Sequence, residues 1–114
     1  MIRSIILSAV FVSFLLPRTL FSQAVVLQSQ ADVDAFDPAT TTINGNLNIN
    51  GYQSSDPITN LSNLSNLTSI SLFIYMISNV ALTNIDGLSN LSTISGGLKI
   101  NNNAALSNLM DLQI

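Results

Sequence analysis

Residues 70–76 read ISLFIYM, and residues 94–100, 24 positions later, read ISGGLKI, with apolar side chains at matching places. The match continues to Leu112, since apolar residues and asparagines recur at the same spacing. Upstream, a run of apolar residues lies 24 positions before its later counterpart: Ile58, Leu61, Leu64 and Leu67 precede Leu82, Ile85, Leu88 and Leu91. A fixed period of this size is typical of a solenoid, in which one repeat forms one coil.

Two finer patterns predict how each coil is built. Leu47 and Ile49 alternate with asparagines, which predicts a short strand with the apolar side chains inward. From Ile58 to Ile70 every third residue is apolar, which suits a backbone that keeps turning around the coil axis. Residues 51–57 are longer by three positions than the matching segment of the later repeat. We expect this insertion in a surface loop.

The segment 25–42 differs from the repeats and is predicted to cap their open end, because terminal repeats of solenoids are atypical. Val25-Val26-Leu27 reads as a strand, and Ser29 is placed to cap a short helix that follows it. We expect Val33 and Phe36 of this helix to pack on the first coil. The predicted fold is therefore mainly β, a parallel β-solenoid with repeats at 43–69, 70–93 and 94–114, the last one incomplete.

The first 24 residues have the pattern of a secretory signal peptide. Arg3 precedes an apolar run that Pro17 interrupts, and small residues stand at positions 22 and 24. We predict cleavage after Ala24, with cleavage after Ser22 as the alternative. An uncleaved anchor would need about 20 apolar residues, and this run is shorter. We therefore expect a secreted or cell-surface protein with no membrane span in the mature chain.

The composition excludes several classes of site. The 114 residues include no Cys and no His, and only 8% are charged. Thiolate and imidazole chemistry and zinc sites are thus excluded, and the six Asp residues do not follow the spacing of a calcium loop. We expect no metal, no cofactor and no enzyme activity. After loss of the leader Lys99 is the remaining cation, which argues against nucleic-acid binding.

Two segments resemble the I-x-G-x-L-x-I signature of receptor L domains, at 43–49 and 94–100. The longer phrase from Leu82 to Leu98 is similar to repeats of secreted bacterial leucine-rich proteins related to those domains. The resemblance covers residues 25–114. It implies a right-handed β-solenoid of short parallel strands that acts in recognition or adhesion at the cell surface, and the family motif carries no catalytic residues. The pattern departs from the family at Leu72-Phe73 and at Ile77, where the later repeat has Gly96-Gly97 and Asn101.

The asparagines form two predicted columns, one of Asn60, Asn84 and Asn108 and one of Asn79 and Asn103. We expect both columns to hydrogen-bond backbone groups of adjacent coils, which is a structural role. Four Asn-Leu-Ser/Thr sequons, at 60, 63, 66 and 90, arise from the same repetition and are not interpreted as glycosylation sites.

One face of the predicted sheet carries the candidate binding residues. Strand alternation places three columns outward: Asn46 with Phe73 and Gly97, Asn48 with Tyr75 and Lys99, and Asn50 with Ile77 and Asn101. Aromatic rings amid polar groups suit stacking on sugars. Our predicted binding residues are Phe73, Tyr75, Asn48, Lys99 and Asn101.

The sequence therefore predicts non-catalytic recognition or adhesion, with carbohydrate or a surface protein as the partner. The alternative is a structural spacer, or a fragment of a longer repeat protein, with no ligand of its own. Leu106, Leu109 and Leu112 fall in the last, incomplete coil. Unpaired strand edges and apolar side chains there predict self-association.

Overall fold

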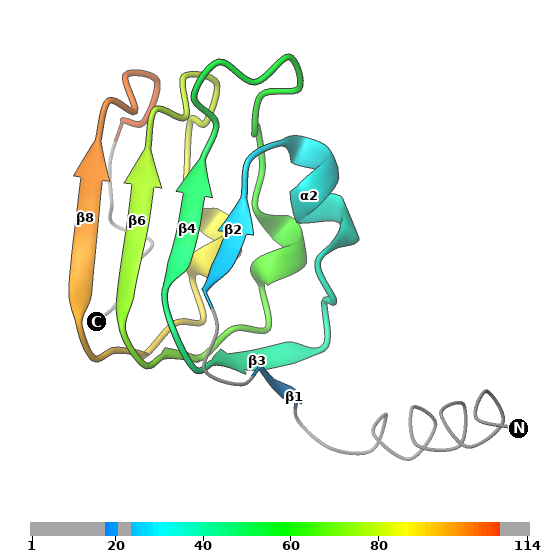
Figure 1. Cartoon of the computed structure of the whole chain (residues 1–114), viewed down its shortest axis with the longest axis vertical. Coiled ribbons are helices and arrows are strands. Elements are labelled where there is room, and N and C mark those ends of the chain that lie inside the picture. Colours follow the sequence, from blue (N-terminus) through cyan, green and yellow to red (C-terminus); the bar gives the residue numbers. More distant parts are fainter. Residues whose placement is uncertain (1–17, 21–23, 108–114) are drawn as a thin grey trace, which may run out of the picture.

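The computed structural model describes residues 18–20 and 24–107 and shows a mainly β protein with two parallel four-stranded sheets (Figure 1). The first sheet has the order β1-β3-β5-β7, with bounds Arg18–Leu20, Thr40–Ile43, Ser69–Ile70 and Thr93–Ile94. The second has the order β2-β4-β6-β8, with bounds Val25–Leu27, Leu47–Asn50, Phe73–Ile77 and Gly97–Asn101. Strands of the two sheets alternate along the chain, so each repeat supplies one strand to each sheet.

The strand register gives the spacing between paired strands and locates the insertion. Ile74 of β6 pairs with Leu98 of β8, 24 positions later (98 − 74), whereas Leu47 of β4 pairs with Ile74 at a distance of 27 (74 − 47). The 3₁₀ turns η1 (Ser62–Leu64) and η2 (Asp86–Leu88) are again 24 apart (86 − 62). The three additional residues therefore lie between β4 and η1, where the sequence predicted a surface loop.

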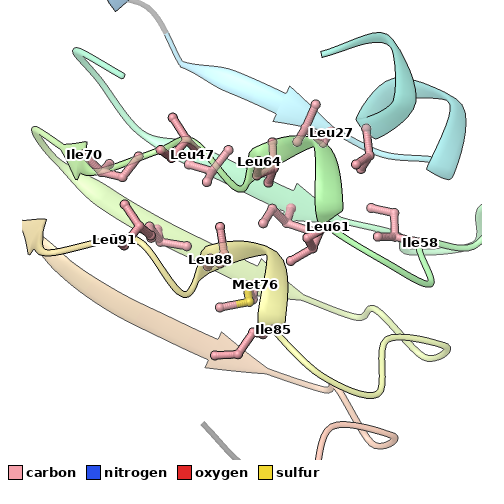
Figure 2. Close-up of a cluster of buried hydrophobic side chains, with 14 of the residues drawn as sticks. Leu27, Leu47, Ile58, Leu61, Leu64, Ile70, Met76, Ile85, Leu88 and Leu91 are labelled. Atoms are coloured by element: carbon pink, nitrogen blue, oxygen red, sulfur yellow. The ribbon is translucent and has the colours of Figure 1, made fainter. Parts of the chain in front are cut away.

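The core lies between the two sheets and the 3₁₀ turns (Figure 2). Leu61, Leu64 and Leu67, spaced by three, are all buried, as are Leu82, Ile85 and Leu88 in the next repeat. A 3₁₀ turn has three residues per turn, so every third side chain points to the same side. This geometry explains the period of three from Leu61 to Leu67. Leu47 and Ile49 are also buried, as their alternation predicted.

The N-terminal segment contains the predicted strand and helix. β2 pairs with β4, and α2 (Gln30–Ala35) follows it beside η1 (Figure 1). The Ser29 hydroxyl accepts a hydrogen bond from the Asp32 amide at 3.1 Å, which is the predicted cap. Val33 is fully buried and Phe36 is half-buried against the core. The packing predicted for these two side chains is confirmed.

The loop that contains the insertion completes the N-terminus of α2. The Asp56 carbonyl accepts a hydrogen bond from the Gln30 amide at 3.0 Å, and its carboxylate accepts one from the Ala31 amide at 2.8 Å. The first amides of a helix lack partners within the helix, and a negative charge there is favourable. The longer loop thus provides the acceptors that the short helix needs.

One asparagine column behaves as predicted. The Asn79 side chain donates to the Ile49 carbonyl and accepts from the Gly51 amide, both at 2.9 Å. In the next repeat Asn103 donates to the Met76 carbonyl at 2.7 Å. These side chains link adjacent repeats by bonding backbone amides and carbonyls that have no partner on a neighbouring strand at the bends.

In the other column the prediction was wrong for Asn60 and Asn84, and Asn108 lies outside the described residues. Asn60 and Asn84 accept hydrogen bonds from the amides of Ser62 and Asp86, two residues further along their own turns. An asparagine side chain readily bonds to the backbone two residues on, and this local bond replaces the predicted contact between repeats.

Asparagines inside or just after the 3₁₀ turns link the repeats instead. Asn66 donates to the Pro38 carbonyl at 2.7 Å, and Asn90 donates to the Ser65 carbonyl at 2.6 Å. Asn63 donates to the carbonyls of Asp34, Val33 and Phe36 at the C-terminal end of α2. These amide nitrogens, each in a sequon, are occupied by structural hydrogen bonds.

Some predictions fall on residues outside those described. Of the predicted leader, residues 1–24, the parts 1–17 and 21–23 lie outside the described residues, as do Leu109 and Leu112. β1, within the predicted leader, pairs with β3 in this chain. In the last repeat Ile94, Leu98, Ile100 and Leu106 are only partly buried. Cleavage of the leader and self-association stay predictions.

Candidate functional site

The outer side of the β2-β4-β6-β8 sheet carries the predicted binding residues. In β4 and β6 the side chains alternate between buried and half-buried, so Asn48, Phe73 and Tyr75 lie opposite the core. We call this side of the sheet the aromatic face, and its members are Val26, Asn46, Asn48, Asn50, Phe73, Tyr75, Ile77, Gly97, Lys99 and Asn101.

The register of the strands arranges these residues in rows. One row is Val26, Asn48, Tyr75 and Lys99, and the next is Asn50, Ile77 and Asn101. Phe73 is paired with Gly97, and its amide donates to the Asn46 side chain at 2.9 Å. The three predicted columns are therefore present, and all five predicted residues lie on one surface.

Two aromatic rings and one ammonium group occupy the centre of the aromatic face. The ring centroids of Phe73 and Tyr75 are 5.7 Å apart, with a 31° angle between the ring planes. The Lys99 Nζ lies 5.5 Å from the centroid of Phe73 and 5.6 Å from that of Tyr75. Both distances suit cation–π attraction. One lysine thus contacts both rings from the neighbouring strand.

The glycine pair beside Phe73 makes room for its ring. A Cβ at Gly96 would lie 2.7 Å from the Leu72 carbonyl and 2.8 Å from the Phe73 ring. Gly97 has φ of +131°, a backbone conformation that side chains disfavour. In the sequence, Leu72-Phe73 was only a departure from the Gly96-Gly97 pattern. In the structure the two pairs are complementary, because the glycines leave the space that the Phe73 ring occupies.

Asn48 differs from the other amides of the aromatic face in its hydrogen bonding. Its Oδ1 is buried and has no hydrogen-bond partner within the part of the chain that the structure describes. An unsatisfied buried acceptor is costly and calls for an explanation. Asn101, by contrast, is exposed, so of these two amides it is the accessible one.

Sequence reasoning did not include Val26 in the site. Its side chain is 48% exposed and stands at the end of the row that contains Tyr75 and Lys99. The alternation within Val25-Val26-Leu27 indicated that Val26 points away from Leu27. Only the pairing of β2 with β4 shows which row it joins.

The rest of the described chain offers no metal centre and no membrane-spanning helix. Over residues 18–20 and 24–107, no three metal-ligating side chains of the His, Cys, Asp and Glu types gather in one place. Within the same residues no helix has the length and apolar character needed to cross a membrane.

Residues 40–113 match the family described as the receptor L domain. The chain belongs to the receptor L domain family. This family is a ligand-binding, non-catalytic module that is typically extracellular. The match contains three of the four strands that carry the site, β4, β6 and β8, together with every aromatic residue of the aromatic face. The chain matches no curated protein and no solved structure.

Proposed function

We propose that this receptor L domain binds carbohydrate non-catalytically through the aromatic face. The observation that carries the proposal is the pair of adjacent rings, Phe73 and Tyr75, at the centre of a regular sheet surface with amide side chains beside them. Membership of a ligand-binding family supports a recognition role. A surface protein is the alternative partner.

The chemistry of the surface suits a sugar. The face of an aromatic ring is electron-rich, and the axial C–H groups of a pyranose carry partial positive charge, so the two stack. The exposed amide of Asn101 can both donate to and accept from sugar hydroxyls. Neighbouring strands about 4.8 Å apart place such groups at regular intervals, as a polymer of similar units requires.

The test compares the parent with a Phe73→Ser, Tyr75→Ser double variant for retention on immobilised polysaccharides and on a glycan array. Tyr52→Ser is the matched control, because Tyr52 is 65% exposed on the loop after β4 and lies outside the aromatic face. Thermal melts of all three proteins establish that each is folded. We expect retention of the parent and of the control, and loss of retention in the double variant.

Two results would overturn the proposal. Retention of a folded double variant equal to that of the parent would exclude this face as the site. A parent that no polysaccharide retains would favour the alternatives, a protein ligand or a spacer without any ligand. Capture of a defined cell-surface protein by the parent, lost in the double variant, would assign the same face to a protein.

We also propose the form of the solenoid and the export of the protein. We propose a right-handed solenoid of about 24 residues per coil, with residues 25–42 as the cap and 43–114 as the repeats. The spacing of the paired strands supports the coil length, and the family match supports the hand. Secretion from a bacterium, with adhesion at the cell surface, is supported by the leader pattern and the leucine-rich repeats. N-terminal sequencing of exported protein tests this, and we expect the mature chain to begin after Ala24 or Ser22.

A further inference from the structure

We propose that the sugar bound by the aromatic face is acidic, with its carboxylate paired to the ammonium of Lys99. This inference rests on the proposed carbohydrate binding and specifies its ligand as a uronic acid. It follows from the charge of the face and from the contacts that the one lysine of the chain makes.

Lys99 has no carboxylate partner in the described part of the chain. Its ammonium group lies over the rings of Phe73 and Tyr75, and the side chain is exposed. The positive charge is therefore held at the centre of the aromatic face by two neutral rings. In most proteins a surface lysine is either free in water or near an acid, so this arrangement keeps the charge available to a ligand.

The acidic residues of the described chain lie on other elements. Asp32 and Asp34 belong to α2, Asp56 to the loop after β4, Asp86 to η2, and Asp37 to the turn before β3. The second sheet itself carries none. The aromatic face is thus positively charged on a protein whose formal net charge is −3. An anion is attracted to this face and repelled from most of the remaining surface.

The contacts available to a neutral sugar and to an acidic sugar differ, and this difference favours the acidic one. A neutral pyranose that stacks on the rings must displace the ammonium and provides no charged group in exchange. A carboxylate provides charge-assisted hydrogen bonds, which are stronger than exposed cation–π contacts. The carboxylate of an acidic sugar therefore replaces the contacts that the ammonium loses when the sugar stacks on the rings.

The register supports a single sugar unit that contacts both groups. Tyr75 and Lys99 are direct partners on adjacent strands. Strands are spaced by about 4.8 Å, close to the width of one pyranose ring. A uronate stacked on Tyr75 thus has its carboxylate within reach of Lys99. One cation matches one carboxylate, so densely sulfated chains gain little from this face.

The test uses short oligomers of galacturonate, mannuronate and glucuronate, each with its methyl ester, titrated into the parent by calorimetry. The ester keeps the sugar and removes only the charge. Because charge-assisted hydrogen bonds carry the difference, we expect at least one acid to bind about tenfold more tightly than its ester. Lys99→Gln should lose the same factor for the acid and should not weaken binding of the ester, which no longer has to displace the ammonium, and Lys99→Arg should retain the preference.

The outcomes separate this inference from the proposed function. Equal binding of acid and ester, unchanged in Lys99→Gln, would overturn the acidic ligand and leave carbohydrate binding in place. Failure of every acid and every neutral glycan to bind would overturn both. Acid binding that depends on Lys99 but survives in the Phe73→Ser, Tyr75→Ser variant would support the charge pairing and overturn stacking. Melts confirm folding, which Lys99→Gln should preserve because Lys99 is exposed.

Discussion

The side-chain oxygen of Asn103 accepts two hydrogen bonds from Asn79, one from its backbone amide and one from its side-chain amide, both at 2.9 Å. Asn79 makes the equivalent contacts one repeat earlier, with the Gly51 amide and the Ile49 carbonyl. A bonded chain of asparagine side chains thus runs across three repeats. These side chains satisfy backbone groups at the bends after β4 and β6.

We predict that Asn79→Ala is much more destabilising than Asn103→Ala. Asn79 is buried, and its removal leaves the Gly51 amide and the Ile49 carbonyl without partners, each at a cost of about 1–3 kcal/mol. Asn103 is half-buried, so water can replace part of its bonds. Denaturant melts measure both losses, and equal losses would show that the column is not buried as described.

We predict that Leu88→Ala lowers the free energy of unfolding by about 2–5 kcal/mol through loss of apolar contacts and creation of a cavity. Leu88 is fully buried in η2, and Leu64 stands at the matching position of η1. Val80→Ala is the matched control, because Val80 is 65% exposed and should lose less than about 0.5 kcal/mol. A loss of that small size at Leu88 would mean that the repeat register is wrong.

We predict that Gly87→Ala destabilises the protein by about 1–3 kcal/mol or more, as overpacking does. A Cβ at Gly87 would lie 2.0 Å from the Leu61 carbonyl oxygen, so the two turns would have to separate. Ser89, at the end of the same turn, is exposed, and Ser89→Ala should have little effect. Unfolding melts of the pair test this, and a neutral Gly87→Ala would contradict the close approach of η1 and η2.

We predict opposite effects for two asparagines of the same strand. Asn48→Val should raise the free energy of unfolding by about 1 kcal/mol, because it removes a buried acceptor without a partner and places a strand-favouring residue in β4. Asn50→Val should lower it, because the Asn50 side chain accepts a hydrogen bond from the Tyr52 amide at 3.0 Å. Thermal melts report both signs, and stabilisation by both changes would contradict the assignment of Asn48.

Much of the fold could be predicted from local patterns. Alternation in Leu47 and Ile49 and the period of three around Leu64 identified the buried side chains, since both patterns depend only on backbone geometry within a few residues. The bonds of Asn60 and Asn84 were predicted wrongly, because position in a repeat does not decide between a local acceptor and a distant one. Asn63 was missed for a related reason. Asn63 corresponds in sequence to Gly87, but Gly87 packs closely on the preceding turn, whereas the Asn63 side chain reaches across a wider gap to α2. The width of that gap depends on the position of the helix.

The sequence by itself determined which residues face the core, which face away, and that strands 24 or 27 positions apart would be neighbours. Only the tertiary structure decided what the outward residues contact. Phe73 occupies the space beside Gly96, Lys99 contacts two rings, and the Oδ1 of Asn48 is left without a partner. The physical reason is that strand periodicity is a local property of the backbone. The conformation of an outward side chain depends on the volume and charge of neighbours that belong to other repeats.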